Sequence, residues 1–157
     1  MRSKILSQAN LTRLCRRLRS QGKKVVFTNG TFDLLHLGHV TYLQKAKKHG
    51  DVLVVGVNTD RSVKSYKGPK RPLNPEKDRI RVLAALKCVD YAALFSDPTP
   101  LNLIKKVKPH VLVKGADWKK SQIAGAKEVE SWGGKVKRIA LVPNRSTTRI
   151  LKLLRAV

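Results

Sequence analysis

Two histidines, His36 and His39, lie three residues apart in the segment TNGTFDLLHLGHVTYL (28–43), with Gly38 between them. The segment follows the apolar run KVVF (24–27) and continues into a stretch with helical spacing. Residues i and i+3 share one face of a helix, so both imidazoles can point to one spot. A helix N-terminus offers free N–H groups to a phosphate, and two imidazoles add hydrogen-bond donors. The spacing therefore predicts a phosphate-binding corner between a strand and a helix.

Two other interpretations of these histidines exist. A zinc site would usually need i, i+4 spacing on a helix and a third His, Cys or carboxylate nearby. His49 and His110 fall at a predicted helix end and strand start, and no cysteine cluster exists, which disfavours zinc. Ordinary packing of both histidines stays open on the spacing alone. The two cysteines are far apart, which predicts free, buried or half-buried thiols.

The charge balance of the chain is strongly basic. It has 34 Lys and Arg against 10 Asp and Glu, a formal net charge of +24, and no acidic residue before Asp33. Such a field attracts polyanions, so a basic nucleic-acid-binding module is an alternative of a different class. With three Phe, three Tyr, two Trp and no recognised nucleic-acid-reading motif, the sequence favours only weak, non-specific polyanion binding.

Length and hydropathy are typical of one globular domain. The chain has 157 residues, of which 41% are apolar, enough for a substantial core. No apolar stretch approaches the roughly 20 residues that cross a bilayer, and the N-terminal residues lack the apolar core of a signal peptide. We therefore expect a cytoplasmic protein.

Apolar and amphipathic runs alternate along the chain, which predicts an α/β fold: a single-domain, Rossmann-like, doubly wound sheet of five parallel strands. Gly22, Gly50 and Gly133 stand where a left-handed residue would end a helix, and 62–75 reads as one long irregular segment. The predicted strands are 24–29, 51–58, 91–95, 110–115 and 135–142. The predicted helices are 10–22, 39–50, 74–89, 99–109, 122–134 and 146–157.

Two motifs resemble those of a known superfamily. GTFDLLHLGH (30–39) resembles the GxFDxxHxGH motif of the nucleotidyltransferases, the small Rossmann-like cytidylyl- and adenylyltransferases. NRSTTR (144–149) resembles the serine-threonine element that opens the last helix of these enzymes and holds the nucleotide phosphates. This implies a basic N-terminal helix over residues 1–22 followed by a nucleotidyltransferase domain over residues 23–157.

Within that superfamily, residues 23–154 resemble the heptose-1-phosphate adenylyltransferases through RPLNPEKDR (71–79), VLVKGADW (111–118) and RSTT (145–148). The resemblance implies transfer of AMP from ATP to D-glycero-D-manno-heptose 1-phosphate, for lipopolysaccharide synthesis, with Mg²⁺ held mainly by the nucleotide phosphates. Thr31 and Trp118 are more typical of glycerol-3-phosphate cytidylyltransferases, so CTP-dependent transfer to glycerol 3-phosphate is the alternative. Relatives are commonly dimers, which implies a homodimer here.

The resemblance also implies roles for individual residues. Those expected to act in catalysis are His36, His39, Lys67 and Arg79. Those expected to bind the nucleotide are Thr28, Asn29, Gly30, Thr31, Phe32, His36, His39, Lys114, Gly115, Asp117, Ser146, Thr147 and Thr148. Those expected to bind the sugar phosphate are Asp33, Lys67 and Trp118, although Asp33 is as well suited to hold a turn.

Overall fold

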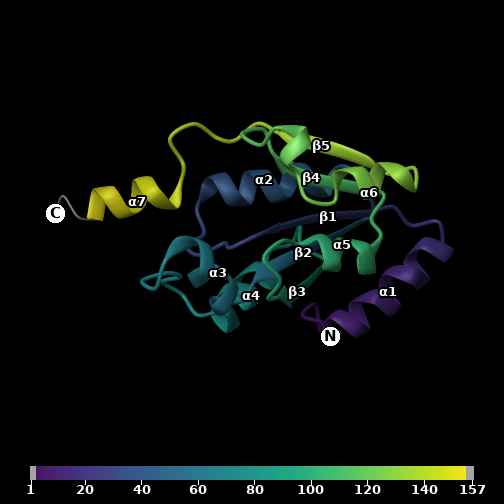
Figure 1. Cartoon of the computed structure of the whole chain (residues 1–157), viewed down its shortest axis with the longest axis horizontal. Helices are drawn as coiled ribbons and strands as arrows, with labels where there is room; N and C mark the ends of the chain where they lie inside the picture. Colours follow the sequence, from purple (N-terminus) through teal and green to yellow (C-terminus); the bar gives the residue numbers. More distant parts are fainter. Residues whose placement is uncertain (1–2, 155–157) are drawn as a thin grey trace.

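Five parallel strands form the central layer of the protein (Figure 1). The computed structural model describes residues 3–154. The strand order is β3-β2-β1-β4-β5, so β1 lies at the centre and the chain winds outward from it in both directions. The predicted fold class is confirmed. The strands are β1 (Val25–Gly30), β2 (Val52–Asn58), β3 (Tyr91–Phe95), β4 (Val111–Gly115) and β5 (Lys135–Ile139).

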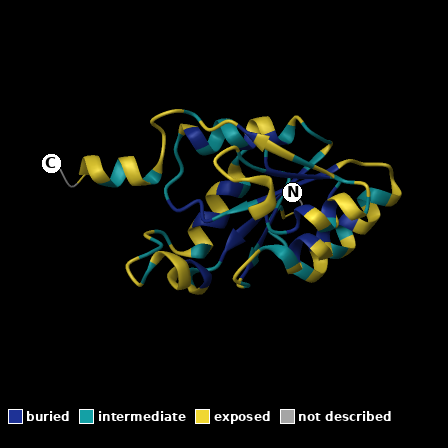
Figure 2. Ribbon diagram, turned by 45° about the horizontal axis from the view of Figure 1, so that its top comes forward, coloured by how far each residue is buried: buried dark blue, intermediate teal, exposed yellow. Residues whose placement is uncertain are grey.

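Helices cover both faces of the sheet and complete two hydrophobic cores. One core joins the sheet to α1 (Gln8–Ser20), α5 (Leu101–Val107) and α6 (Ala126–Ser131). The other joins it to α2 (Leu37–Lys47) and α4 (Glu76–Ala85). Each inner strand is therefore buried on both sides, as its continuous apolar sequence predicted (Figure 2). The remaining helical segments are α3 (Asp60–Lys67), the 3₁₀ turn η1 (Lys120–Gln122) and α7 (Thr147–Leu154).

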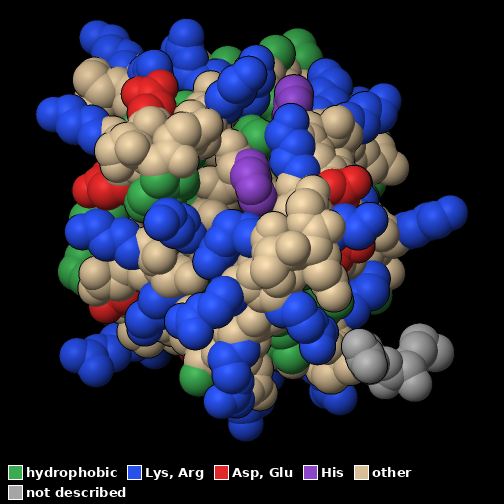
Figure 3. Space-filling view, turned by 90° about the vertical axis from the view of Figure 1, so that its right-hand side faces the viewer, with side chains coloured by type: hydrophobic (Ala, Val, Ile, Leu, Met, Phe, Trp, Pro, Cys, Tyr) green, Lys and Arg blue, Asp and Glu red, His purple; other side chains and the backbone are tan. Residues whose placement is uncertain are grey.

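The basic N-terminal helix α1 packs on the same core as the rest of the chain. Leu11 and Cys15 are fully buried against the sheet, and the Arg19 guanidinium donates a hydrogen bond of 2.5 Å to the carbonyl of Val107 in α5. Cys15 and Cys88 are free thiols, buried and half-buried, as predicted. Lys and Arg side chains spread over the end of the molecule where the strands begin (Figure 3). Among residues 3–154, no helix is long and apolar enough to cross a membrane.

The segment predicted to be irregular, residues 62–75, begins with a helix. Thr59 caps α3, because its hydroxyl accepts a hydrogen bond from the backbone N–H of Ser62, and Asp60 supplies an acidic first turn. The glycine and prolines that follow Lys67 made the whole segment look irregular in sequence. Irregular structure is confined to residues 68–75, at the end of the sheet where the strands finish.

The helix-ending glycines divide into two kinds. Gly22 and Gly133 have φ values of +71° and +82°, so the prediction of left-handed residues is confirmed at these positions. The prediction was wrong for Gly50, whose φ is not positive. Gly50 is instead packed against β1: a Cβ there would lie 2.6 Å from the Lys24 carbonyl oxygen and 2.7 Å from the Val26 Cγ2. Because Gly50 has no side chain, its backbone can pack closely against the backbone of Lys24.

Because Gly50 faces a backbone carbonyl that cannot rotate away, we expect Gly50→Ala to destabilise the fold by about 1–3 kcal/mol. Urea unfolding at pH 7 measures this. Lys48→Ala, an exposed substitution at the end of the same helix, is the matched control and should change stability by less than about 0.5 kcal/mol. Wild-type stability of Gly50→Ala would contradict the close approach.

Candidate active site

The corner between β1 and α2 positions the two histidines. β1 ends at Gly30, Phe32 then takes a left-handed conformation with φ +49°, and His36 precedes the first turn of α2 with an extended backbone. The Phe32 ring lies over Gly30, where a Cβ would come within 3.0 Å of it. The backbone N–H of His39 donates a 2.9 Å hydrogen bond to the carbonyl of His36. The chain thus turns sharply and brings both histidines to the end of the central strand.

The imidazoles of His36 and His39 are stacked on each other. Their centroids are 3.9 Å apart with 24° between the planes, and Phe32 meets the His39 ring edge-on at 5.3 Å. Both Nδ1 atoms are buried and make no hydrogen bond to the described residues. The two rings are therefore packed together, and Nε2 is the nitrogen of each that is available to a ligand.

Both histidines favour the neutral form. Burial lowers the pKa of His36, and burial together with the adjacent His36 lowers the pKa of His39 to about 4. At neutral pH the corner therefore offers two uncharged imidazoles, which can donate hydrogen bonds without exchanging protons with a phosphate.

The serine-threonine motif lies against this corner, although more than a hundred residues separate the two in sequence. A Cβ on Gly38 would lie 2.9 Å from the Arg145 carbonyl oxygen, so only glycine admits the returning chain. The Thr147 hydroxyl donates a 3.4 Å hydrogen bond to the Leu34 carbonyl. Ser146 caps α7, as predicted, since its hydroxyl accepts a hydrogen bond from the Arg149 N–H. Two helix N-termini, those of α2 and α7, thus lie beside the histidines.

Asp33 binds the loop that follows α3 and makes no contact with the histidines. Its buried carboxylate accepts hydrogen bonds of 2.9–3.0 Å from the backbone N–H groups of Leu73 and Asn74, and pairs with the Arg71 guanidinium at 2.7 Å. Of the two predicted roles for Asp33, the structure shows the one that holds a turn. In this conformation the carboxylate is fully engaged with the loop. Contact between Asp33 and the sugar phosphate stays a prediction.

Arg79, predicted to act in catalysis, is buried and bonded within the protein. The residue is only 2% exposed, and it donates to the carbonyls of Thr31 at 2.5 Å, Asn58 at 2.7 Å and Asn74 at 2.9 Å. It also pairs with the Asp60 carboxylate at 2.8 Å. With Nε, Nη1 and Nη2 all donating to the protein, Arg79 joins three segments of the site, and its catalytic role stays a prediction.

Lys67 ends α3 beside the histidines; its side chain is exposed as a whole, but its amine is partly shielded from solvent. Its charge contributes to the lowered pKa of His39, and its own pKa is lowered by burial of the amine and by the nearby Arg71. The neighbouring Tyr66 was not among the residues predicted from sequence. Its hydroxyl lies 2.5 Å from that of Thr31, and no sequence pattern marks such a pair.

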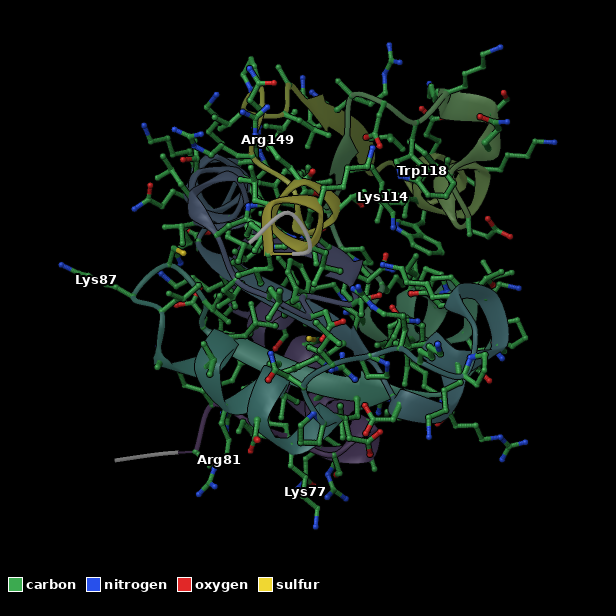
Figure 4. The ribbon with its side chains drawn as sticks, turned by 90° about the vertical axis from the view of Figure 1, so that its left-hand side faces the viewer. Lys77, Arg81, Lys87, Lys114, Trp118 and Arg149 are labelled. Carbon is green, nitrogen blue, oxygen red and sulfur yellow. The ribbon has the colours of Figure 1, made fainter. Side chains whose placement is uncertain are left out.

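The ends of β1 and β4 bring together the polar residues predicted to surround the base and ribose. The Lys114 amine donates to the Asn29 side-chain oxygen at 2.5 Å and lies 5.8 Å from the Trp118 ring centroid. Burial lowers the pKa of Lys114 to about 8, against the opposing effect of Asp117. Trp118 is 48% exposed. Figure 4 shows Lys114 and Trp118 near each other at this edge, whereas Lys77, Arg81 and Lys87 point away.

Thr28, predicted to bind the nucleotide, has its side chain engaged within the fold. It is fully buried, and its hydroxyl pairs with that of Tyr42 at 2.8 Å within the fold. Nucleotide contact stays a prediction for Thr28 and for the other residues predicted to bind it, which lie at the end of β1 and in the corner after it, at the end of β4 and at the start of α7. Among residues 3–154, no group of three His, Cys, Asp or Glu side chains is placed to hold a metal ion.

Comparison with known proteins identifies the family. Residues 27–152 match the family model described as cytidylyltransferase-like. The chain belongs to the cytidylyltransferase-like family. It is therefore a nucleotidyltransferase, and the resemblance predicted from the two motifs is confirmed.

Curated relatives are similar over nearly the whole chain. The bifunctional protein HldE of Methylobacillus flagellatus is 56% identical over 136 residues, which are 87% of this chain and 28% of that protein. HldE of Magnetococcus marinus is 52% identical over 153 residues, 98% of this chain and 31% of that protein. The cytidylyltransferase-like chain thus spans about three tenths of the length of these relatives.

Two solved structures share the fold. A lipopolysaccharide core biosynthesis protein from Thermoplasma volcanium superposes with a TM-score of 0.63 at 32% identity, covering 77% of this chain and 98% of that one. A pantoate-β-alanine ligase from Francisella tularensis superposes with a TM-score of 0.64 at 18% identity, covering 98% of this chain and 77% of that one. The second shows the fold alone.

Protonation of His39 should make the fold acid-sensitive. Its pKa is about 4 in the folded state, below the ordinary 6.5, so the unfolded chain binds the proton first. The stability should be unaffected above pH 6.5 and should fall as the pH drops from 6.5 towards 4. We expect His39→Asn to reduce this loss by on the order of 2 kcal/mol in urea titrations at pH 7, 5.5 and 4.5.

The matched control is His49→Asn, in the turn after α2 and away from the corner, which should keep the wild-type dependence on pH. If His39→Asn lost stability on acidification as steeply as the wild type, the buried neutral imidazole would be excluded.

Proposed function

We propose that this nucleotidyltransferase transfers AMP from ATP to D-glycero-D-manno-heptose 1-phosphate and releases pyrophosphate. The observation that carries the proposal is the stacked neutral histidine pair between the N-termini of α2 and α7. The choice of a heptose acceptor is supported by the identity to HldE proteins and by the likeness to a lipopolysaccharide core biosynthesis protein.

The reaction is a single in-line displacement. An oxygen of the sugar 1-phosphate attacks the α-phosphorus of ATP, the bond to the bridging oxygen of the β-phosphate breaks, and pyrophosphate leaves. The attacking phosphate is already ionised, so no general base is needed, which agrees with two histidines whose pKa values are lowered. Catalysis then consists of positioning and of stabilising charge on the phosphoryl oxygens.

We assign a different phosphate contact to each group of residues around the corner. His36 and His39 donate hydrogen bonds to the α-phosphate, and the backbone N–H groups at the start of α7 hold the outer phosphates. Lys67 holds the acceptor phosphate from the opposite side. Mg²⁺, which we expect to be held mainly by the phosphates of ATP, would neutralise part of their charge. The Asp33 carboxylate already binds Arg71 and two backbone N–H groups.

CTP-dependent transfer to glycerol 3-phosphate is the second candidate. Thr31 and Trp118 favour it, because both are more typical of glycerol-3-phosphate cytidylyltransferases. Trp118 is half-exposed beside Lys114, where it can meet either base.

Pyrophosphate release tests the proposal when ATP and CTP are crossed with heptose 1-phosphate and glycerol 3-phosphate. We expect release only with ATP and the heptose. His39→Ala should lower kcat by at least about 100-fold, since a phosphate contact made in the transition state is lost, while His49→Ala should act as wild type. Release only with CTP and glycerol 3-phosphate would replace the proposed substrates, and silence in all four mixtures would refute both candidates.

ATP affinity should depend on the protonation of Lys114. The amine is cationic below its pKa of about 8 and loses its charge above it. We expect the Kd for ATP to rise roughly three- to tenfold between pH 7 and pH 9.5, and Lys114→Met to weaken binding at pH 7 and abolish this rise. Isothermal titration calorimetry measures both. Lys77→Met, on α4 and pointing away from the site, is the control; an unchanged pH dependence in Lys114→Met would contradict the assignment.

Homodimer formation, weak non-specific polyanion binding and a cytoplasmic location stay predictions. ATP and a sugar phosphate are the partners that the proposed reaction requires.

A further inference from the structure

Residues 66–74, here called the strap, lie beside the histidines, and the role given to them below rests on the proposed function. The strap contains the last two residues of α3 and the loop that follows, and it lies at the same end of the molecule as the start of α2 (Figure 1). It contains Lys67, the cation assigned above to the acceptor phosphate. What holds this segment in place therefore decides where that cation lies.

One end of the strap is fastened to the turn after β1 through backbone atoms. Asp33 accepts hydrogen bonds from the N–H groups of Leu73 and Asn74, and the Asn74 side chain donates back to the Asp33 carbonyl at 2.6 Å. The Arg71 ion pair with Asp33 lies on the same side. These contacts come after Lys67 in the chain, and Gly68, with φ +88° and open space around it, separates them from the lysine.

The other end is joined to Thr31 by one hydrogen bond between two side chains. Its backbone is also held locally, since Gly68 donates to the Lys64 carbonyl at 3.1 Å and accepts from the Arg71 N–H at 3.2 Å. The Tyr66 hydroxyl lies 2.5 Å from the hydroxyl of Thr31, which is only 8% exposed. Tyr66 itself is 53% exposed, so packing holds it weakly and the hydroxyl contact fixes the ring. The Lys67 amine lies 5.8 Å from the centroid of that ring. Without the hydroxyl pair, the last turn of α3 would be free to fray at Gly68.

We propose that Tyr66 is a positioning residue for nucleotidyl transfer. Its hydroxyl bond to Thr31 fastens the strap on the Lys67 side, and Asp33 fastens it on the other side. The bond thereby holds the Lys67 amine beside the histidines, where it can bind the acceptor phosphate. The role depends on the Thr31 hydroxyl, which gives that side chain a function separate from any backbone contact to the nucleotide.

Tyr66→Phe keeps the ring and removes the bond. Ordering a long side chain costs about 0.5–1.5 kcal/mol, so we expect the KM for the sugar phosphate to rise roughly three- to tenfold while the KM for ATP stays within twofold. Thr31→Val should reproduce this change and Thr31→Ser should restore wild-type values, because serine keeps the hydroxyl. In the double variant Tyr66→Phe with Thr31→Val, the two effects should not add. Tyr91→Phe, at the first residue of β3 and therefore at the end of the sheet where the strands begin, is the control.

Limited trypsin digestion tests the strap without using the reaction. Trypsin can cut after Lys67 and Lys70, and we expect Tyr66→Phe and Thr31→Val to be cut there roughly three- to tenfold faster than the wild type, Thr31→Ser and Tyr91→Phe. Wild-type cleavage in Tyr66→Phe would refute the fastening. Faster cleavage with an unchanged KM for the sugar phosphate would refute the positioning role. If no substrate pair reacts, the proposed function fails, and the digestion still decides whether Tyr66 fastens the strap.

Discussion

The guanidinium of Arg79 is the contact on which the site's geometry depends. It donates to carbonyls from the turn after β1, the end of β2 and the strap, and it is neutralised by Asp60. These three segments are far apart in sequence and have no other common partner among the described contacts. A buried charge whose N–H groups are used in this way is very costly to remove, because three carbonyls would lose their donor at once.

Charge in the site follows from this arrangement. The carboxylates of Asp33 and Asp60 are each paired with an arginine. Lys67 and Lys114 are left as cations facing the edge where the strands end, while the histidines are neutral. The site is therefore positive. The lowered pKa values of both lysines and both histidines reflect mainly the burial of these groups, to which neighbouring basic groups add for His39 and Lys67.

The sequence predicted the architecture well because its strands are continuous apolar runs, and a run such as VLVVGV suits only a strand buried on both faces. It predicted the histidine corner because the spacing of His36 and His39 has a direct geometric meaning. The sequence could not show which basic residues bind other parts of the protein. Arg79 and Lys67 were both predicted to be catalytic, yet Arg79 is buried and bonded to three segments, whereas Lys67 is exposed. Tyr66 was missed because a pair of hydroxyls across 35 residues leaves no periodic signal.

The position of α7 has a thermodynamic consequence. The helix starts against Gly38 and Leu34, then extends from the body with none of its described residues buried (Figures 1 and 2). Eight residues are too few to form a stable helix in water alone. A triphosphate bound at its first turn would therefore supply part of the free energy that keeps the helix folded, which couples folding to binding. A nucleoside without phosphates would gain nothing from this element, so the chain would discriminate by phosphate content as well as by base.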